Sequence, residues 1–520
     1  MRYHLALLFL WFASSAGAMA GSVSGVVFHD ANHNGRLDDG EGGIPRVLVS
    51  NGSDVVPTGP FGGFELPVGD AATVFVIQPR GWRVPVDDHH RPQFHYIHRP
   101  GGSPPLAYDG VAPTGPLPER IEFPLYPADG DGPHRILLLG DPQPYTQAEV
   151  DHFARSTIAE LAGSPDVAAA IVLGDIVGDD LSLFEPVSAA LARVGVPVWY
   201  VYGNHDMDFD APDDESADDT FEATFGPATY AFQVGYTHFI VLDDVIYPYD
   251  GPQRYMGGLR EDQYVFLENY LDHVPTDDRI VLAMHIPLED FGGTFRVTDR
   301  ERLFALLADH PHTLSLSAHT HTQNHFFYDH RHGWPHAEPH HHYNVGTTSG
   351  SWWQGPPDAD GVPVSPMRDG TPKGYALLTL EGADYGLRYK ATGHPADEQM
   401  ALFVPQVIPR SGWWPGYVYA NVYNGEERTL VEWRVDGGPW RSMKHLEPQP
   451  DPTYSRRMLT TWSQHHPPRG KPLPAPGLSR HLWRATLPGG LRSGLHAVEV
   501  RVADPYGGQF SRTTTFRVAQ

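Results

Sequence analysis

The stretch RILLLGD, residues 135–141, contains the pattern on which the fold of this chain depends. Its apolar run ends in glycine and an acidic residue, and AAAIVLGD at 168–175 repeats this arrangement. VPVWYVYGN at 196–204 is a third case, with asparagine in the last position. Helical spacing at 149–161 and 186–194 separates the runs. This alternation predicts crossover connections, a sheet covered on both faces, and polar residues at strand ends where α/β proteins bind ligands.

The flanking segments lack this alternation. Short strand-like runs at 24–28, 47–50 and 73–77, separated by Gly and Pro, predict an N-terminal β module. Beyond about residue 393 we expect no helices, a β-sandwich, and a long loop in the Pro-rich stretch 465–476. The expected organisation is a signal peptide at 1–20, the β module at 21–127, a catalytic α/β domain at 128–395 and the C-terminal β-sandwich at 396–520.

The amino-acid composition disfavours several classes of function and of site. The 520 residues carry a formal net charge of −26, which argues against a nucleic-acid-binding surface or an anionic-membrane surface. The chain has no cysteine, so disulfides and thiolate metal sites are excluded. No apolar run is long enough for a transmembrane segment.

The N-terminus has the pattern of a secretory signal. Arg2 precedes an apolar run at 5–12, and Ala18-Met19-Ala20 forms a cleavage site before Gly21. We therefore expect an exported protein, periplasmic or secreted. The alternative is a buried N-terminal strand or an anchor.

The polar residues at the predicted strand ends form a set of metal ligands. Carboxylate, amide and imidazole groups suit divalent Mn, Fe or Zn, and one shared carboxylate, Asp175, would bridge two ions. The candidates are Asp141, Gln143, Asp175, Asn204, His205, Asp206, His285, His319 and His321.

Five short blocks within 134–325 resemble, in order, the signature of the calcineurin-like metallophosphoesterases. They are Gly140-Asp141-Pro142-Gln143, Gly174-Asp175, Gly203-Asn204-His205-Asp206, His285 and Ala318-His319-Thr320-His321. The resemblance implies a four-layer α/β-β-α sandwich. With the segments around Tyr96 and 346–369, the chain is similar to an exported bacterial branch in which all-β N-terminal and C-terminal domains flank the catalytic domain.

The resemblance also implies a role for each residue. One metal would be held by Asp141, Gln143, Asp175 and His321, and the other by Asp175, Asn204, His285 and His319. Metal-activated hydroxide would attack phosphorus, while His205, held by Asp206, would protonate the leaving oxygen. Gln143 replaces the family's more common histidine, which implies a looser or harder first metal. Asp179 and Asp180 replace the commoner asparagine after the second block, and we assign them no role.

A second candidate cation site lies near the N-terminus. Oxygen-bearing residues alternate along a twelve-residue segment with Gly35 at the sixth position, a spacing typical of calcium loops. Arg36 would contribute only its backbone carbonyl. Strand-like flanks indicate a calcium-binding β module and not an EF-hand, and the alternative is a solvated turn. The candidate ligands are Asp30, Asn32, Asn34, Arg36, Asp38 and Glu41.

Two further features are ambiguous. Seven histidines lie between 325 and 342, which indicates either a second metal-binding or substrate-binding loop or an irregular surface loop. Trp352 and Trp353 are candidates for a wall of the substrate cleft, and Arg368 for a phosphate ligand. The alternative for the tryptophans is packing between domains.

The expected activity is hydrolysis of phosphodiesters or phosphomonoesters with two divalent metal ions. The alternatives are a pyrophosphatase or nucleotidase on the same scaffold, and a non-catalytic, metal-dependent surface-binding protein. The expected partner is a phosphoester substrate. The sequence does not determine the oligomeric state.

Overall fold

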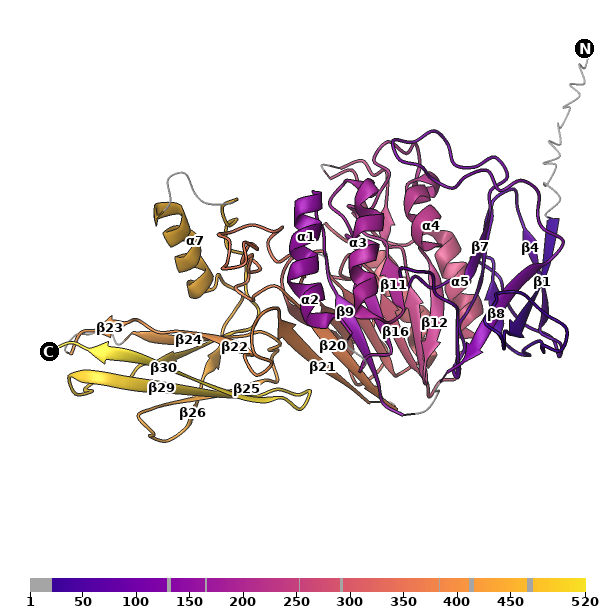
Figure 1. Ribbon diagram of the computed structural model, residues 1–520. Coiled ribbons are helices and arrows are strands. Elements are labelled where there is room, and N and C mark those ends of the chain that lie inside the picture. The colour runs from indigo at the N-terminus through magenta and orange to yellow at the C-terminus, as the bar shows by residue number, and fades with distance from the viewer. Residues whose placement is uncertain are drawn as a thin grey trace, which may run out of the picture.

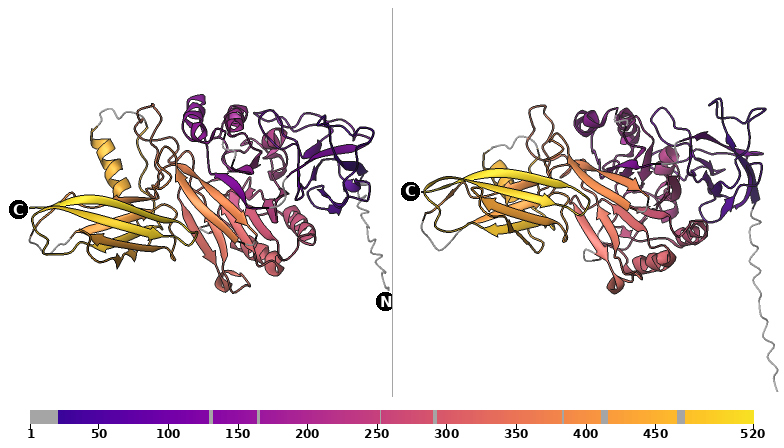
Figure 2. Two further views of the ribbon diagram at one scale, coloured as in Figure 1. Left: turned by 60° about the horizontal axis from the view of Figure 1, so that its bottom comes forward. Right: turned by 90° about the horizontal axis from the view of Figure 1, so that it is seen from below.

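The computed structural model describes residues 21–128, 132–163, 166–251, 253–289, 293–382, 384–410, 416–464 and 471–520. The expected signal peptide and residues 465–470 of the Pro-rich stretch lie outside these ranges. Figures 1 and 2 show three parts in a row, with an N-terminal β region at one end, an α/β region in the middle and a C-terminal β region at the other end.

The first central sheet has five strands. Its three parallel strands are those predicted from the apolar runs, and their apolar side chains are buried. Helices separate these strands along the chain. Two antiparallel strands from much later in the sequence complete the sheet beside β9. The order is β11 (Val198–Val201), β10 (Ala169–Leu173), β9 (His134–Leu139), β20 (Gly374–Glu381) and β21 (Asp384–Ala391).

The second central sheet has six strands. Parallel pairing joins β13, β16, β17 and β19, and an antiparallel strand closes each edge. The order is β12 (Tyr230–Val234), β13 (Thr237–Val241), β16 (Arg279–Ala283), β17 (Thr313–Ser317), β19 (His340–Asn344) and β18 (Asn324–Tyr328). A separate ribbon pairs β14 (Val245–Ile246) with β15 (Met256–Gly257).

Helices cover the outer faces of these two sheets, and their inner faces pack together (Figures 1 and 2). This is the predicted four-layer α/β-β-α sandwich, in which the first sheet is covered on one face by a second sheet. None of the helices in the described ranges has the length and apolar character that a membrane span needs. The helices are α1 (Gln147–Arg155), α2 (Thr157–Leu161), α3 (Phe184–Leu191), α4 (Asp219–Phe225), α5 (Glu261–Leu271) and α6 (Val297–Leu306).

The N-terminal region consists of two four-stranded sheets. Its buried Val, Phe and Leu side chains join the same apolar core as the central region. One sheet has the order β4 (Gly63–Val68), β1 (Gly21–His29), β8 (Ile121–Pro127) and β6 (Trp82–Arg83). The other has the order β3 (Val55–Pro57), β2 (Leu48–Ser50), β5 (Ala72–Val76) and β7 (His95–His98).

The C-terminal region has two sheets around a core of its own. The expectation of no helices there is wrong, because α7 (Pro452–Gln464) packs near β22. Asp451 starts this helix by accepting the N–H of Tyr454 at 2.6 Å, and Pro452 suits the first helical position. The sheets are β22 (Met400–Phe403), β24 (Tyr417–Val422), β28 (Leu482–Thr486) and β27 (Lys444–His445), and β23 (Val407–Ile408), β30 (Gln509–Val518), β29 (Gly494–Ala503), β25 (Leu430–Val435) and β26 (Arg441–Ser442).

The histidine-rich stretch is not the expected loop, because its ends form strands β18 and β19. The rings of His340 and His342 are buried and bond to hydroxyls of the neighbouring strand β17. Ser315 Oγ lies 2.7 Å from both His340 Nε2 and His342 Nδ1, and Ser317 Oγ lies 2.8 Å from His342 Nε2. These bonds satisfy the polar groups inside the sheet, so histidine takes the place that apolar residues hold in the neighbouring strands.

This packing predicts that the protein loses stability in weak acid. Burial lowers the pKa of His340 to about 3 and that of His342 well below its usual value. Because the unfolded chain binds these protons first, the stabilisation is complete above about pH 6.5 and is lost as the pH falls. At pH 5.5 each such histidine lowers the free energy of unfolding by about 1.4 kcal/mol relative to neutral pH.

The measurement is urea unfolding at pH 7.5 and pH 5.5. His340→Gln is expected to reduce the difference in unfolding free energy between the two pH values by about 1.4 kcal/mol. The exposed His330→Gln is the control and should leave the difference unchanged. An undiminished difference in the His340 variant would contradict this explanation.

Candidate metal centre

The predicted ligands come together where the carboxyl ends of the two central sheets meet. Asp141, Asp175 and Asn204 follow β9, β10 and β11, while His285 and the pair His319 and His321 follow β16 and β17. Parallel strands bring their ends to one edge, so residues far apart in sequence become neighbours.

The shortest contacts centre on His285. Its Nε2 lies 3.2 Å from Asp175 Oδ1, 3.1 Å from Asn204 Oδ1 and 3.2 Å from His319 Nδ1. Asp175, His285 and His319 each offer a ligand atom, and these atoms lie within 4.8 Å of one another. On the other side of Asp175, its Oδ2 accepts from Gln143 Nε2 at 3.1 Å.

Two buried oxygens in this cluster have no hydrogen-bond partner, Asp141 Oδ2 and Gln143 Oε1. Asp141 Oδ2 lies 3.1 Å from His321 Nε2 but without hydrogen-bond geometry. A buried polar atom without a hydrogen-bond partner destabilises the fold by roughly 1–3 kcal/mol. These two oxygens therefore indicate a binding partner that comes from outside the protein chain. Carboxylate, amide and imidazole donors fit divalent cations, and the residues therefore suit the metals that the sequence predicts.

The backbone at these residues is strained. Asp141, Gln143, Asp175, His319 and His321 all have positive φ, between 35° and 65°. Residues other than glycine rarely adopt this conformation, and it is concentrated at functional sites where the surrounding structure enforces it. Here it directs side chains from successive strand ends toward a common point.

Two glycines leave room for the ligands. A Cβ on Gly174 would lie 2.4 Å from His285 Nδ1, and a Cβ on Gly203 would lie 2.6 Å from Asp175 Oδ1. Gly174 also has a φ of +80°. The glycine in the Gly-Asp and Gly-Asn blocks is therefore required by close packing around the ligands.

Hydrogen bonds fix which nitrogen of two histidines faces the centre. His285 Nδ1 lies 2.8 Å from the Leu173 carbonyl, and His321 Nδ1 lies 2.5 Å from the Gly350 carbonyl. Each ring donates from Nδ1, so Nε2 is the nitrogen directed at the centre, and a cation bound there takes the place of a proton. Burial lowers the pKa of His321 to about 4, which keeps the ring neutral, as a metal ligand must be.

The predicted partner of His205 is wrong. Its Nδ1 lies 2.5 Å from Asp179 Oδ1, a residue to which the sequence led us to assign no role. The Asp206 carboxylate instead accepts backbone N–H groups of Ile176, Val177 and Gly203, at 3.2, 3.2 and 3.0 Å. Asp206 points toward these turns because three backbone donors converge there, and it fixes the loops and not the imidazole.

The His205 ring carries a raised pKa of about 9. Burial lowers this pKa, but the carboxylates of Asp175 and Asp179 more than offset that effect. The ring is 28% exposed, so it is accessible from the solvent side of the centre. A partly exposed imidazole that holds its proton near neutral pH has the properties of a proton donor.

Several residues around the centre carry no local signal in the sequence. Asp244 accepts the backbone N–H of His285 at 3.1 Å and thereby supports the turn after β16. The ring of Tyr145 lies 6.0 Å from that of His205, and the ring of Tyr255 lies 6.2 Å from that of His319. Both tyrosines are half-buried and border the cluster.

The N-terminal region also reaches this edge of the central domain. The Tyr108 hydroxyl lies 3.4 Å from the Asp179 carbonyl and 3.3 Å from Asp180 Oδ1. A residue of the N-terminal region therefore contacts the loop that holds His205.

The three residues predicted to bind substrate lie in different surroundings. Trp353 is buried and donates from Nε1 to the Pro142 carbonyl at 2.9 Å, so it belongs to the core and not to a cleft wall. Trp352 is half-buried and stacks on His321 with ring centroids 4.1 Å apart, which places it beside the ligand cluster. Arg368 donates to the Ala475 carbonyl at 3.2 Å, a contact to the C-terminal region.

The candidate calcium loop follows β1. Buried Asp30 accepts the N–H groups of Asn34 and Gly35, at 3.2 and 2.7 Å. Asn32 and Asn34 both donate their amides to Asp38. The side-chain oxygens are therefore gathered by hydrogen bonds within the loop, and calcium binding there stays a prediction.

Three family models match consecutive parts of the chain. Residues 31–106 match the N terminal of calcineurin-like phosphoesterase, residues 134–323 match calcineurin-like phosphoesterase, and residues 342–510 match its C terminal. No curated protein sequence matches.

Solved structures give more distant likenesses. Purple acid phosphatase PPD1 from yellow lupin (Lupinus luteus) is 15% identical, with 67% of each chain covered and a TM-score of 0.38. A structure of PhoD is 13% identical, with 74% of this chain and 91% of that chain covered and a TM-score of 0.35. Both TM-scores are too low for conclusions about this chain.

Proposed function

Because this chain belongs to the calcineurin-like phosphoesterases and is a metal-dependent hydrolase, we propose that it cleaves phosphodiesters or phosphomonoesters with two divalent metal ions and His205 as general acid. The observation that carries the proposal is the convergence of seven predicted ligands on one buried cluster with unpaired oxygens. The ligands are Asp141, Gln143, Asp175, Asn204, His285, His319 and His321.

The ligand positions support a division into two sites that share Asp175. Its Oδ1 faces His285, beside Asn204 and His319, while its Oδ2 accepts from Gln143, and Asp141 and His321 form a further pair 3.1 Å apart. Two such cations would polarise the phosphoryl oxygen and activate the attacking water. The backbone strain and the hydrogen bonds to Leu173 and Gly350 hold the ligands ready to bind them.

His205 is placed to act on the leaving group. Its Nδ1 bonds to Asp179, so Nε2 carries the proton that can be transferred to the departing oxygen. Tyr145, Tyr255 and Trp352 lie beside His205, His319 and His321, respectively, and are the aromatic residues proposed to contact the organic part of the substrate.

The test is hydrolysis of a chromogenic phosphomonoester and a chromogenic phosphodiester by the metal-free chain, with Mn²⁺, Zn²⁺ or Fe²⁺ added back. The expected result is turnover that depends on the metal, and the ratio of the two rates assigns the ester class. Pyrophosphate and nucleotides, tested in the same assay, examine the alternative substrates. Absence of bound metal at any concentration would refute the proposal.

Two further predictions concern the N-terminus. The signal pattern supports export. N-terminal sequencing of protein recovered outside the cytoplasm tests this prediction, and the expected first residue is Gly21.

The loop 30–41 is predicted to bind Ca²⁺, which would raise the melting temperature of the wild type but not of Asp38→Asn. Equal shifts in both proteins would contradict the calcium prediction.

A further inference from the structure

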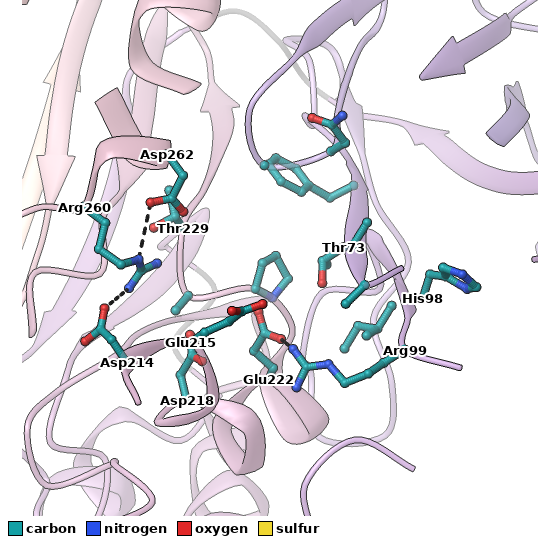
Figure 3. Close-up of a pocket in the computed structure, with 18 of the residues that line it drawn as sticks. Thr73, His98, Arg99, Asp214, Glu215, Asp218, Glu222, Thr229, Arg260 and Asp262 are labelled. Atoms are coloured by element: carbon teal, nitrogen blue, oxygen red, sulfur yellow. Dashed lines mark hydrogen bonds and ion pairs between the residues drawn. The ribbon is translucent and has the colours of Figure 1, made fainter. Parts of the chain in front are cut away.

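A cavity of about 540 Å³ lies between the N-terminal region and the central domain, away from the metal ligands (Figure 3). The N-terminal wall comes from β5, β7 and the turn at Asn51 and Gly52. The opposite wall comes from the segment 213–218, helix α4, residues 227–229, and Arg260 and Asp262 at the start of α5. None of the proposed metal ligands lines this cavity.

The lining is strongly acidic. Six carboxylates face two arginines, Arg99 and Arg260, which leaves four negative charges in excess if all groups are ionised. The lining carboxylates are Asp213, Asp214, Glu215, Asp218, Glu222 and Asp262.

Both arginines are already paired. Arg260 lies 3.4 Å from both Asp214 and Asp262 and also contacts Asp243 behind the wall. Arg99 lies 3.3 Å from Glu222 and also contacts Asp219. The arginines therefore have little charge left to neutralise the remaining carboxylates.

Of the lining carboxylates that these pairs do not satisfy, Asp218 is the buried one, whereas Asp213 and Glu215 are exposed. Asp218 is 7% exposed, and no hydrogen bond or ion pair to its side chain occurs among the described residues. Asp218 precedes α4, yet its side chain does not cap the helix. In the view of Figure 3 it lies between the two arginines, and the charges of Glu222, Arg260 and Arg99 all act on it. A buried, unpartnered carboxylate directed into a cavity is costly for the fold unless a ligand pairs with it.

The pKa values show that a negative charge on these carboxyl groups is costly as long as no cation pairs with it. Burial raises the pKa of Asp218 well above its ordinary value, and the neighbouring Glu222 raises it further. Burial likewise raises the pKa of Glu222 and of Asp214. The charged groups that face Asp218 from the surrounding elements are Glu222, Asp243, Arg260 and Arg99.

The spacing of these carboxylates disfavours a single metal ion. Among the described residues, only Asp175, His285 and His319 form a group whose ligand atoms lie within 4.8 Å of one another. No three of the described carboxylates of the cavity form such a group, and Ala71, Ala72, Phe75 and Ile97 supply apolar surface on the opposite wall. Separated negative charges that face an apolar wall match a cation with an alkyl chain.

We propose that this cavity binds an organic cation with two or more amino groups on an alkyl chain, of the diamine or polyamine class. One ammonium group pairs with Asp218 and Glu222, and the alkyl chain lies against the N-terminal wall. Binding ionises Asp218 and releases its proton, so affinity rises with pH.

The test is isothermal titration calorimetry of the purified chain with spermidine at low ionic strength. We expect saturable binding, and we expect heats measured in buffers of different ionisation enthalpy to show proton release. Asp218→Asn should weaken binding by about tenfold or more, since it removes a charge-assisted contact. The exposed Asp151→Asn is the matched control outside the cavity and should bind spermidine as the wild type does.

A second variant avoids the buried position. Ala71 is an exposed residue of the cavity wall, so Ala71→Arg places a cation there without disturbing the core. Ala71→Arg should abolish binding, while Ala71→Gln, of similar length and without charge, should retain most of it. Spermidine binding unchanged in both Asp218→Asn and Ala71→Arg would overturn the proposal. So would heats that NaCl of equal ionic strength reproduces, or Mg²⁺ binding at these residues in preference to spermidine.

Discussion

Asp175→Asn is expected to lower metal-dependent hydrolysis by about a thousand-fold, which corresponds to about 4 kcal/mol of lost transition-state stabilisation. Asp175 is the residue whose two oxygens face the two halves of the ligand cluster, Oδ1 toward His285 and Oδ2 toward Gln143. Asparagine keeps the size of the side chain but removes the negative charge and one of the two acceptors, so a shared carboxylate is lost without a cavity being created.

Rates for Asp175→Asn should be measured together with bound metal, determined by elemental analysis of the same samples. We expect fewer metal ions per chain in the variant than in the wild type. Asp151→Asn, the same exchange at an exposed position of α1, should keep both activity and metal. Wild-type turnover in Asp175→Asn would remove the basis for a shared carboxylate.

His205→Ala is expected to lower turnover by about 10²–10⁴-fold while metal content stays at the wild-type level. The ring of His205 faces Asp179 and is partly exposed, whereas His285 and His321 of the ligand cluster are buried. Substrates with a good leaving group need less protonation, so the loss should be smaller for a nitrophenyl ester than for an alkyl ester. Loss of metal in His205→Ala, or an equal loss for both leaving groups, would count against the role of proton donor.

The orientation of His205 can be assigned by comparing two neighbouring aspartates. Asp179→Asn replaces the charged partner of the imidazole with a neutral amide and should lower turnover by about tenfold, the equivalent of roughly 1.4 kcal/mol. Asp206→Asn weakens the acceptor of three backbone N–H groups and should lower unfolding stability by roughly 1–3 kcal/mol, with a smaller effect on the folded enzyme's turnover. The reverse pattern would restore Asp206 as the orienting residue.

The pattern of the chain was sufficient for much of the fold. Apolar runs ending in Gly-Asp or Gly-Asn predicted β9, β10 and β11 and the placement of their polar residues at one edge. This succeeds because the central parallel strands are fully buried, so burial appears as an unbroken apolar run. Strand β19 escaped prediction because hydroxyl groups of β17 satisfy its buried His340 and His342, and that compensation is invisible along the chain.

Long-range pairing accounts for the remaining differences. Strands β20 and β21 complete the first sheet beside β9 although more than 200 residues separate them from it, and no local pattern encodes that neighbour. The contact of Asp179 with His205 and the burial of Trp353 against Pro142 depend in the same way on how turns from different strands pack.

The sequence by itself determined the ligand set and the α/β character of the central domain. The glycine needed for close packing and the carboxylate, amide or imidazole needed as a ligand directly follow the apolar runs, so both can be identified from short segments of the chain. Only the tertiary structure decided which aspartate holds His205, which tryptophan borders the metal centre, and that an acidic cavity with an unpaired Asp218 lies between two regions of the chain. Those features depend on distances between side chains from separate elements, and such distances exist only after the elements have packed.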